Sequence, residues 1–227
     1  MTGAVRWLAC DRGDVPDGLD WLAPDERARL EAFRFAPWRA DFLLGRWTAK
    51  RLIAGVFPGA GLAAIAIRAA ADGAPEAFAD GAPLPLTVSI SHRAGRALVA
   101  VGDLGAALGA DLELVEPRSA LLVADFFTAG EAAEVAACLP AARDRAIALI
   151  WSAKESALKA RRTGLREDPR RIRVEADRIA AAPDGAWRAL RIGVDGGPAL
   201  AGWWRDDAGH VLTIAGAALA TDPPRPG

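Results

Sequence analysis

Two long segments of the chain, residues 38–54 and roughly 141–162, have the pattern of apolar and polar positions expected of helices. Each segment ends near a glycine, Gly55 or Gly164, and glycine commonly follows the last turn of a helix. The second segment has a pair of arginines in its last turn, where cations interact favourably with the helix dipole. The sequence therefore predicts one long helix in each half of the chain.

Shorter runs rich in β-branched residues indicate strands. Residues 86–90 and 97–102 flank a turn that contains glycine, and residues 202–216 have the pattern of a hairpin with its turn at 207–209. Residues 71–85 are interrupted so often by glycine and proline that a loop is expected there.

Three short patterns occur twice along the chain, in the same order and at a slowly growing separation. They are Trp-Thr/Ser-Ala-Lys at 47–50 and 151–154, a β-branched run at 65–67 and 172–174, and Ala-Gly-x-x-Leu at 94–98 and 208–212. Such a repeat indicates one helix, strand and hairpin unit used twice. The sequence therefore predicts an α+β fold with a site where the two halves face each other.

The composition restricts the class of protein. The formal net charge is -1, so an anionic ligand must be met by a local group of cations, and nucleic acid is not an expected partner. No apolar run is long enough to span a membrane, and the N-terminal residues lack the apolar core of a signal peptide. Cys10 and Cys138 show no metal-site or disulfide spacing. We expect a cytoplasmic monomer without membrane contact.

Lysine is rare in this chain. Arginine supplies all but three of the 28 basic residues, and the exceptions are Lys50, Lys154 and Lys159. A coding bias that replaces lysine with arginine wherever either serves would leave lysine only where a guanidinium does not fit. The three lysines therefore become candidate site residues.

Asp111 and Glu113 are the first candidates for chemistry. If residues 108–113 form a strand, the period of two places both carboxylates on one face and Leu112 on the other. Two neighbouring carboxylates provide half of a Mg²⁺ site. The alternative is an ordinary solvated strand face.

Glu155 is a candidate third carboxylate. On a helix it shares one face with Trp151 and Lys159, and Lys154 is its neighbour in sequence. The alternative is an exposed Glu-Lys pair, although the tryptophan on the same face favours partial burial.

Further candidates lie in the first half of the chain. Ser91 and His92 follow a predicted strand, where they could act on a ligand or simply stabilise the turn. A Ser/His nucleophile pair is disfavoured because no nucleophile-elbow motif surrounds it. Arg46 and Lys50 lie on one helix face, which could bind phosphates or face solvent.

Four motifs in a fixed order carry a resemblance to a known family: GRWTAK (45–50), SISHRAG (89–95), GADLE (109–113) and WSAKESALK (151–159). With residues 22–35 they resemble the 4'-phosphopantetheinyl transferase superfamily, of the two-lobed type that activates surfactin synthetase and similar enzymes. The resemblance implies an α+β fold of two similar lobes related by a pseudo-two-fold axis, here residues 1–105 and 106–227.

The resemblance also implies an activity. The phosphopantetheine arm of coenzyme A would be transferred to a serine of an apo acyl or peptidyl carrier protein, releasing adenosine 3',5'-bisphosphate. Mg²⁺, or Mn²⁺ in its place, would bind the pyrophosphate. The candidate carriers are those of fatty-acid, polyketide and nonribosomal peptide synthesis.

Residue roles follow by matching motifs. Asp111, Glu113 and Glu155 match the family's metal ligands, and either Glu155 or a metal-bound water would take the proton of the serine hydroxyl. Lys154 and Lys159 would meet the phosphates and the charge that develops during transfer.

Coenzyme A contacts are implied for Arg46 and Lys50 on the basic helix and for Ser91 and His92 after the strand. One departure concerns a basic residue that many members carry between glycine and proline, where this chain has Ala74. Arg93 or Arg96 would compensate.

The competing functions are a coenzyme A-binding or carrier-docking protein without turnover, and another Mg²⁺-dependent phosphoryl-transfer enzyme or nucleotide hydrolase, although no P-loop is present.

Overall fold

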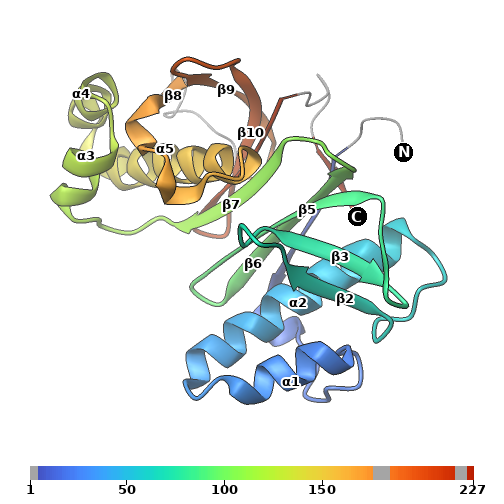
Figure 1. The fold of residues 1–227 in the computed structure, drawn as a ribbon. Helices are drawn as coiled ribbons and strands as arrows, with labels where there is room; N and C mark the ends of the chain where they lie inside the picture. The colour runs from blue at the N-terminus through green and yellow to red at the C-terminus, as the bar shows by residue number, and fades with distance from the viewer. Residues whose placement is uncertain (1–4, 176–184, 218–223) are drawn as a thin grey trace. The chain divides into compact units, whose positions relative to one another are not determined.

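The computed structural model describes residues 5–175, 185–217 and 224–227 (Figure 1). By its internal contacts the chain divides into unit 1, Met1–Ala106 with Pro224–Gly227, and unit 2, Ala107–Pro223. The sequence interpretation placed the C-terminal residues in the second lobe, but here they lie with unit 1 because β12 pairs in parallel with β1. Each unit combines helices with sheet, which confirms the α+β class.

In unit 1 one sheet has the strand order β12-β1-β6-β5 and another has the order β2-β3-β4. Helix α2 packs against β1, β5, β6 and β2. The bounds are β1 (Arg6–Asp11), α1 (Pro24–Ala32), α2 (Ala36–Val56), β2 (Ile65–Ala69), β3 (Pro75–Ala79), β4 (Ala82–Pro83), β5 (Leu86–Arg93), β6 (Arg96–Asp103) and β12 (Arg225–Pro226), with a short 3₁₀ turn, η1 (Arg12–Asp14), after β1.

In unit 2 a sheet with the order β7-β11-β10-β9-β8 packs against α5, which contacts β7 and β11 along its length (Figure 1). The bounds are β7 (Leu108–Leu114), α3 (Ala120–Phe126), α4 (Ala129–Ala137), α5 (Pro140–Ala160), β8 (Ile172–Glu175), β9 (Arg188–Val194), β10 (Leu200–Asp207) and β11 (His210–Gly216), with 3₁₀ turns η2 (Gly164–Arg166) and η3 (Pro169–Arg171).

The two predicted long helices are confirmed as α2 and α5. Each has a proline in its first turn, Pro37 or Pro140, where the missing N–H leaves no hydrogen bond unmade. The buried face of α5 includes Ile150, Ala153 and Ala157, whose spacing of three and four residues places them together in the core of unit 2. Within the described residues, none of the helices has the length and apolar character needed to cross a bilayer.

Both predicted hairpins are also confirmed. The turn of β5-β6 lies at Ala94 and Gly95 and that of β10-β11 at Ala208 and Gly209, and all four residues have positive φ. Two successive positive φ values suit the twist of tight hairpins.

The expected loop at 71–85 is wrong, because this segment contains β3 and β4. Glycine and proline there mark tight turns between short strands, with positive φ at Gly73, Asp80 and Gly81.

Candidate active site

Strand β7 and helix α5 approach each other unusually closely at Gly109. A Cβ added to Gly109 would lie 1.8 Å from the backbone oxygen of Ser156 and 2.6 Å from the backbone nitrogen of Ala160. Only glycine fits at such a separation. The face of β7 that carries Gly109 therefore lies directly against α5.

Asp111 and Glu113 lie on the same face of β7 as Gly109, because side chains of a strand alternate. Asp111 Oδ1 is 2.7 Å from Lys159 Nζ, which also donates to the carbonyl oxygen of Ala110 at 3.1 Å. Leu112, on the other face, is buried. The expected alternation along this strand is thus present, and β7 and α5 bring Asp111 to Lys159.

Glu155 lies one turn before Lys159 on α5. Burial raises the pKa of Glu155 above its ordinary value; the Asp111 and Glu113 carboxylates raise it further and the Lys159 ammonium opposes them. Among the described residues, the Glu155 side chain makes neither a hydrogen bond nor an ion pair. A half-buried carboxylate with a raised pKa, close to two others, is typical of a functional site.

Arg118 is a site residue that the sequence interpretation missed. Its Nη2 atom lies 2.5 Å from Glu113 Oε2 and 3.4 Å from Glu116 Oε1. Arg118 lies in the segment between β7 and α3, beyond the last residue of the GADLE motif. An acidic strand end followed closely by Pro117 and an arginine was the available signal.

The donor set suits a hard divalent cation, because it consists of three carboxylates from two adjoining elements and two of them lie close enough to Glu155 to raise its pKa. In the part of the chain that the structure describes, no group of three or more acidic, histidine or cysteine side chains is arranged to hold an ion. Asp111 and Glu113 are instead each paired with a cation, Lys159 and Arg118.

Lys154, expected to meet phosphate, lies elsewhere. Its side chain is fully buried, and Nζ lies 2.9 Å from Glu131 Oε2 and donates to the carbonyl oxygens of Pro169 and Ile172. Glu131 Oε1 accepts the N–H of Val174 at 2.9 Å. Lys154 therefore joins α5 to α4 and β8, which is a structural role in place of the expected phosphate contact.

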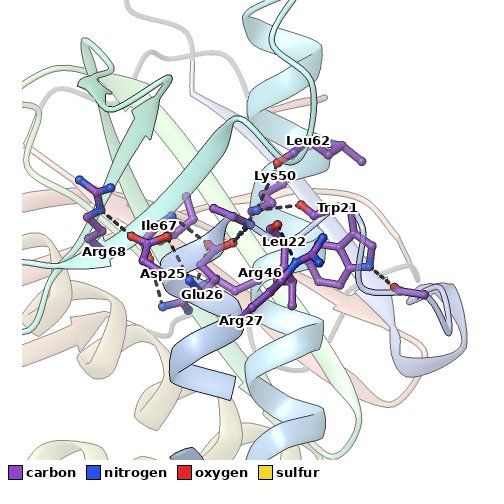
Figure 2. Close-up of polar contacts among 12 residues, drawn as sticks. Trp21, Leu22, Asp25, Glu26, Arg27, Arg46, Lys50, Leu62, Ile67 and Arg68 are labelled. Atoms are coloured by element: carbon purple, nitrogen blue, oxygen red, sulfur yellow. Dashed lines mark hydrogen bonds and ion pairs between the residues drawn. The ribbon is translucent and has the colours of Figure 1, made fainter. Parts of the chain in front are cut away.

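Lys50 has the same role in unit 1. Its ammonium lies 2.5 Å from Glu26 Oε2 and donates hydrogen bonds to the carbonyl oxygens of Trp21 and Leu62 (Figure 2). Glu26 Oε1 accepts the N–H of Ile67 at 3.0 Å. Through Glu26, Lys50 joins α2 to α1 and β2. Its side chain is fully buried, so it does not face solvent.

We call each buried lysine and glutamate pair, Lys50 with Glu26 and Lys154 with Glu131, an anchor. The two anchors make corresponding contacts. Each glutamate is the third residue of a short helix and accepts the N–H of the residue before that helix, Ala23 in unit 1 and Thr128 in unit 2. Each then receives a lysine from the long helix and an N–H from the following strand. This shared arrangement agrees with the internal repeat in the sequence.

Arg46 is partly enclosed by the unit 1 anchor. Its Nε lies 3.6 Å from Glu26 Oε1 and its guanidinium stacks 4.5 Å from the centre of the Phe42 ring (the anchor is drawn in Figure 2). Burial lowers the pKa of Arg46, which Glu26 opposes. The side chain keeps 17% of its surface exposed, so one part still reaches solvent.

Ser91 and His92 are consecutive residues of β5 and so point to opposite faces of its sheet. His92 is exposed, its Nδ1 is 3.8 Å from Asp41 Oδ2, and its ring lies near Gly45 of α2. Ser91 is buried. Of the residues proposed to replace the basic residue missing at Ala74, Arg93 is exposed, whereas Arg96 is largely covered and lies 3.6 Å from Asp11.

The chain resembles known proteins in two comparisons. A holo-(acyl-carrier-protein) synthase from Bacillus anthracis, solved with coenzyme A (3',5'-ADP), aligns with 18% identity and a TM-score of 0.37 over 44% of this chain and 93% of its own. The holo-[acyl-carrier-protein] synthase of Thermotoga maritima aligns with 16% identity and a TM-score of 0.35 over 53% and 80%. These TM-scores do not establish a shared fold.

No curated protein matches the chain in sequence. The second comparison is with protein families, and residues 107–199 match the 4'-phosphopantetheinyl transferase superfamily. The matched segment begins just before β7 and contains Asp111, Glu113, Glu155 and Lys159. The match covers less than half of the chain, and over this segment the chain is similar to the 4'-phosphopantetheinyl transferase superfamily.

Proposed function

We propose that the protein transfers the 4'-phosphopantetheine arm of coenzyme A to a serine of an apo acyl or peptidyl carrier protein, and so is a holo-[carrier-protein] synthase. The observation that carries the proposal is the group formed by Asp111, Glu113, Glu155 and Lys159 on adjoining β7 and α5, inside the segment that matches the superfamily. The resemblance of the motifs in unit 1 to the two-lobed, surfactin-synthetase-activating type supports that subtype.

The reaction needs a base and positive charge. The serine oxygen of the carrier attacks the β-phosphorus of coenzyme A, the bond to the bridging pyrophosphate oxygen breaks, and adenosine 3',5'-bisphosphate leaves with the electron pair. Glu155 is suited to take the hydroxyl proton because its pKa is raised and because it forms no hydrogen bond or ion pair with another described side chain. The nucleophile is supplied by the partner, so a catalytic serine is not required in this chain.

Lys159 keeps 29% of its side-chain surface accessible, whereas Lys50 and Lys154 are fully buried. It is therefore the lysine assigned to the phosphates. Asp111, Glu113 and Glu155 would hold Mg²⁺ or Mn²⁺, which when bound neutralises charge on the transferred phosphoryl group. The fit rests on the donor chemistry, since hard oxygen ligands are those that these ions prefer.

In unit 1 fewer residues are proposed to contact coenzyme A than the motifs implied. Arg46 and His92 retain exposed surface and are proposed to meet the phosphates. Ser91, which precedes His92 in β5, is buried and points to the opposite face of the sheet. Lys50 and Lys154 are left out, because their ammonium groups are enclosed by carboxylate and carbonyl oxygens. The matching anchors in the two units support a duplicated, two-lobed origin of the chain.

The test is intact-mass measurement of an apo carrier protein after incubation with the protein, coenzyme A and Mg²⁺. We expect the carrier to gain one phosphopantetheine arm, with no gain in excess chelator or without enzyme. Binding of coenzyme A without any mass gain would favour the coenzyme A-binding or carrier-docking alternative. Nucleotide release without carrier modification would favour a hydrolase.

A further inference from the structure

Arg118 occupies the segment between the end of β7 and the start of α3, directly before the helix-capping Ser119. Its guanidinium bridges Glu113 and Glu116, with the shorter contact, 2.5 Å, to Glu113. Only 18% of the Arg118 side chain and 13% of the Glu113 side chain are exposed. This is a mostly enclosed ion pair, and one of its carboxylates belongs to the candidate active site.

Asp111 has a corresponding cation from the opposite element, since Lys159 of α5 lies 2.7 Å from its Oδ1. Two of the three candidate ligands are thus held by cations of the protein itself. Any divalent ion that binds these carboxylates must share them with Arg118 and Lys159. Like charges around one carboxylate repel, so each protein cation weakens the binding of the incoming ion.

We propose that Arg118 is a positioning residue that holds the Glu113 carboxylate and competes with the divalent cation for it, so that Arg118 sets the metal affinity of the site. The inference rests on the proposed function, which assigns Glu113 as a metal ligand. Arg118 need not touch the substrate.

A purely structural role makes a different prediction. If Arg118 only ties the segment 115–118 to β7, its removal lowers stability and leaves metal affinity unchanged. If it competes for Glu113, removal of its charge strengthens metal binding even when stability falls. Metal affinity measured without coenzyme A or carrier therefore separates the two roles.

The experiment is Mn²⁺ binding to the full-length protein after treatment with chelator, followed by the electron paramagnetic resonance signal of the free ion. We expect Arg118→Gln to lower the Mn²⁺ Kd by about three- to tenfold, as removal of one like charge near the ion predicts. Arg118→Lys keeps the charge and should remain near wild type. Arg170→Gln, which removes an exposed arginine paired with Asp168, is the matched control and should have no effect.

The outcomes separate this inference from the proposed function. Glu113→Gln should weaken Mn²⁺ binding; if it does, an unchanged or raised Kd in folded Arg118→Gln overturns the role of Arg118 alone. If wild type binds Mn²⁺ no better than Glu113→Gln, the metal assignment fails and the inference fails with it. Circular dichroism of each variant establishes that the protein is folded, and Arg118→Met, which also removes the charge and should also lower the Mn²⁺ Kd, replaces Arg118→Gln if that variant does not fold.

Discussion

The ammonium group of Lys154 lies 2.9 Å from Glu131 Oε2, and both side chains are buried in unit 2. Two carbonyl oxygens complete the surroundings of Lys154 Nζ. Burial lowers the pKa of Lys154, and the hydrogen bond and charge of Glu131 oppose that shift. A compact ammonium can donate to three acceptors in different directions, which the planar guanidinium cannot do in the same volume. This accounts for a lysine in an arginine-rich chain.

Replacement of Lys154 by methionine should therefore lower the free energy of unfolding by about 3–5 kcal/mol, because it leaves the Glu131 carboxylate buried without its cation. Urea unfolding followed by circular dichroism measures the loss. Lys154→Arg should also destabilise, since the larger group does not fit. The double variant Glu131→Gln with Lys154→Met should lose less than the sum of the single variants. Additive losses would contradict a coupled pair.

Gly109 is expected to be intolerant of any side chain. In Gly109→Ala the new methyl group would overlap the Ser156 carbonyl oxygen, so β7 and α5 must separate. We expect a loss of at least about 3 kcal/mol in unfolding free energy, at the upper end for overpacking, and loss of transfer activity because Asp111 moves away from Lys159. Thermal unfolding and the carrier mass assay measure both.

Gly55 of α2 provides the control for this substitution. A Cβ at Gly55 meets nothing within 4 Å, and the residue is exposed within a helix. Gly55→Ala should therefore be neutral or stabilise by up to about 1 kcal/mol, through helix propensity alone. An equally small effect at both glycines would contradict the close contact of β7 with α5.

The sequence was sufficient for features that depend on local periodicity. The two long helices, both hairpins and the shared face of Asp111 and Glu113 follow from spacings of three to four residues or of two. The short strands in residues 75–83 were missed because glycine and proline interrupt the segment at intervals too short for a strand pattern to show. The helices α1, α3 and α4 were also not predicted; each is short.

The partners of the lysines depend on contacts between distant residues, which periodicity does not show. Lys50 pairs with Glu26 and Lys154 with Glu131, and the two partners of each pair lie on different helices. The capping pattern Thr128-x-x-Glu131 was visible in the sequence and identifies the start of α4. It does not reveal that the same carboxylate also receives Lys154.

Glu167 should make stability depend on pH. Hydrogen bonds from Arg161 lower the pKa of Glu167 below its ordinary value of 4.5, with burial opposing and Thr163 assisting. In the window between the two values the unfolded chain holds more protons on this carboxyl, so the free energy of unfolding rises with pH. The contribution is complete above the ordinary pKa and is lost as pH falls through the lowered one.

Glu167→Gln should consequently be less stable than wild type at about pH 6, and the difference should shrink as the pH falls to about 3. Chemical unfolding at a series of pH values measures this. Arg161→Gln should produce the same pH-dependent loss, and the double variant should add little to either single one. A difference between wild type and Glu167→Gln that stays constant with pH would rule out this linkage.

Substitution of Glu155 by glutamine should have opposite effects on stability and on activity. Its carboxylate is desolvated near Asp111 and Glu113, which raises its pKa and makes the charged form unfavourable in the folded protein. Glu155→Gln removes this repulsion while keeping the size of the side chain. Without added divalent ions, the variant should melt at the same temperature as wild type or higher.

The same substitution should lower the rate of carrier modification by at least about 100-fold, because it removes the proposed base and a metal ligand. Glu31→Gln, which neutralises an exposed carboxylate of α1, is the matched control and should change neither the melting temperature nor the rate. Differential scanning fluorimetry and the intact-mass assay on the same preparations provide the two readouts. A lower melting temperature together with an unchanged rate would mean that Glu155 stabilises the fold and takes no part in transfer.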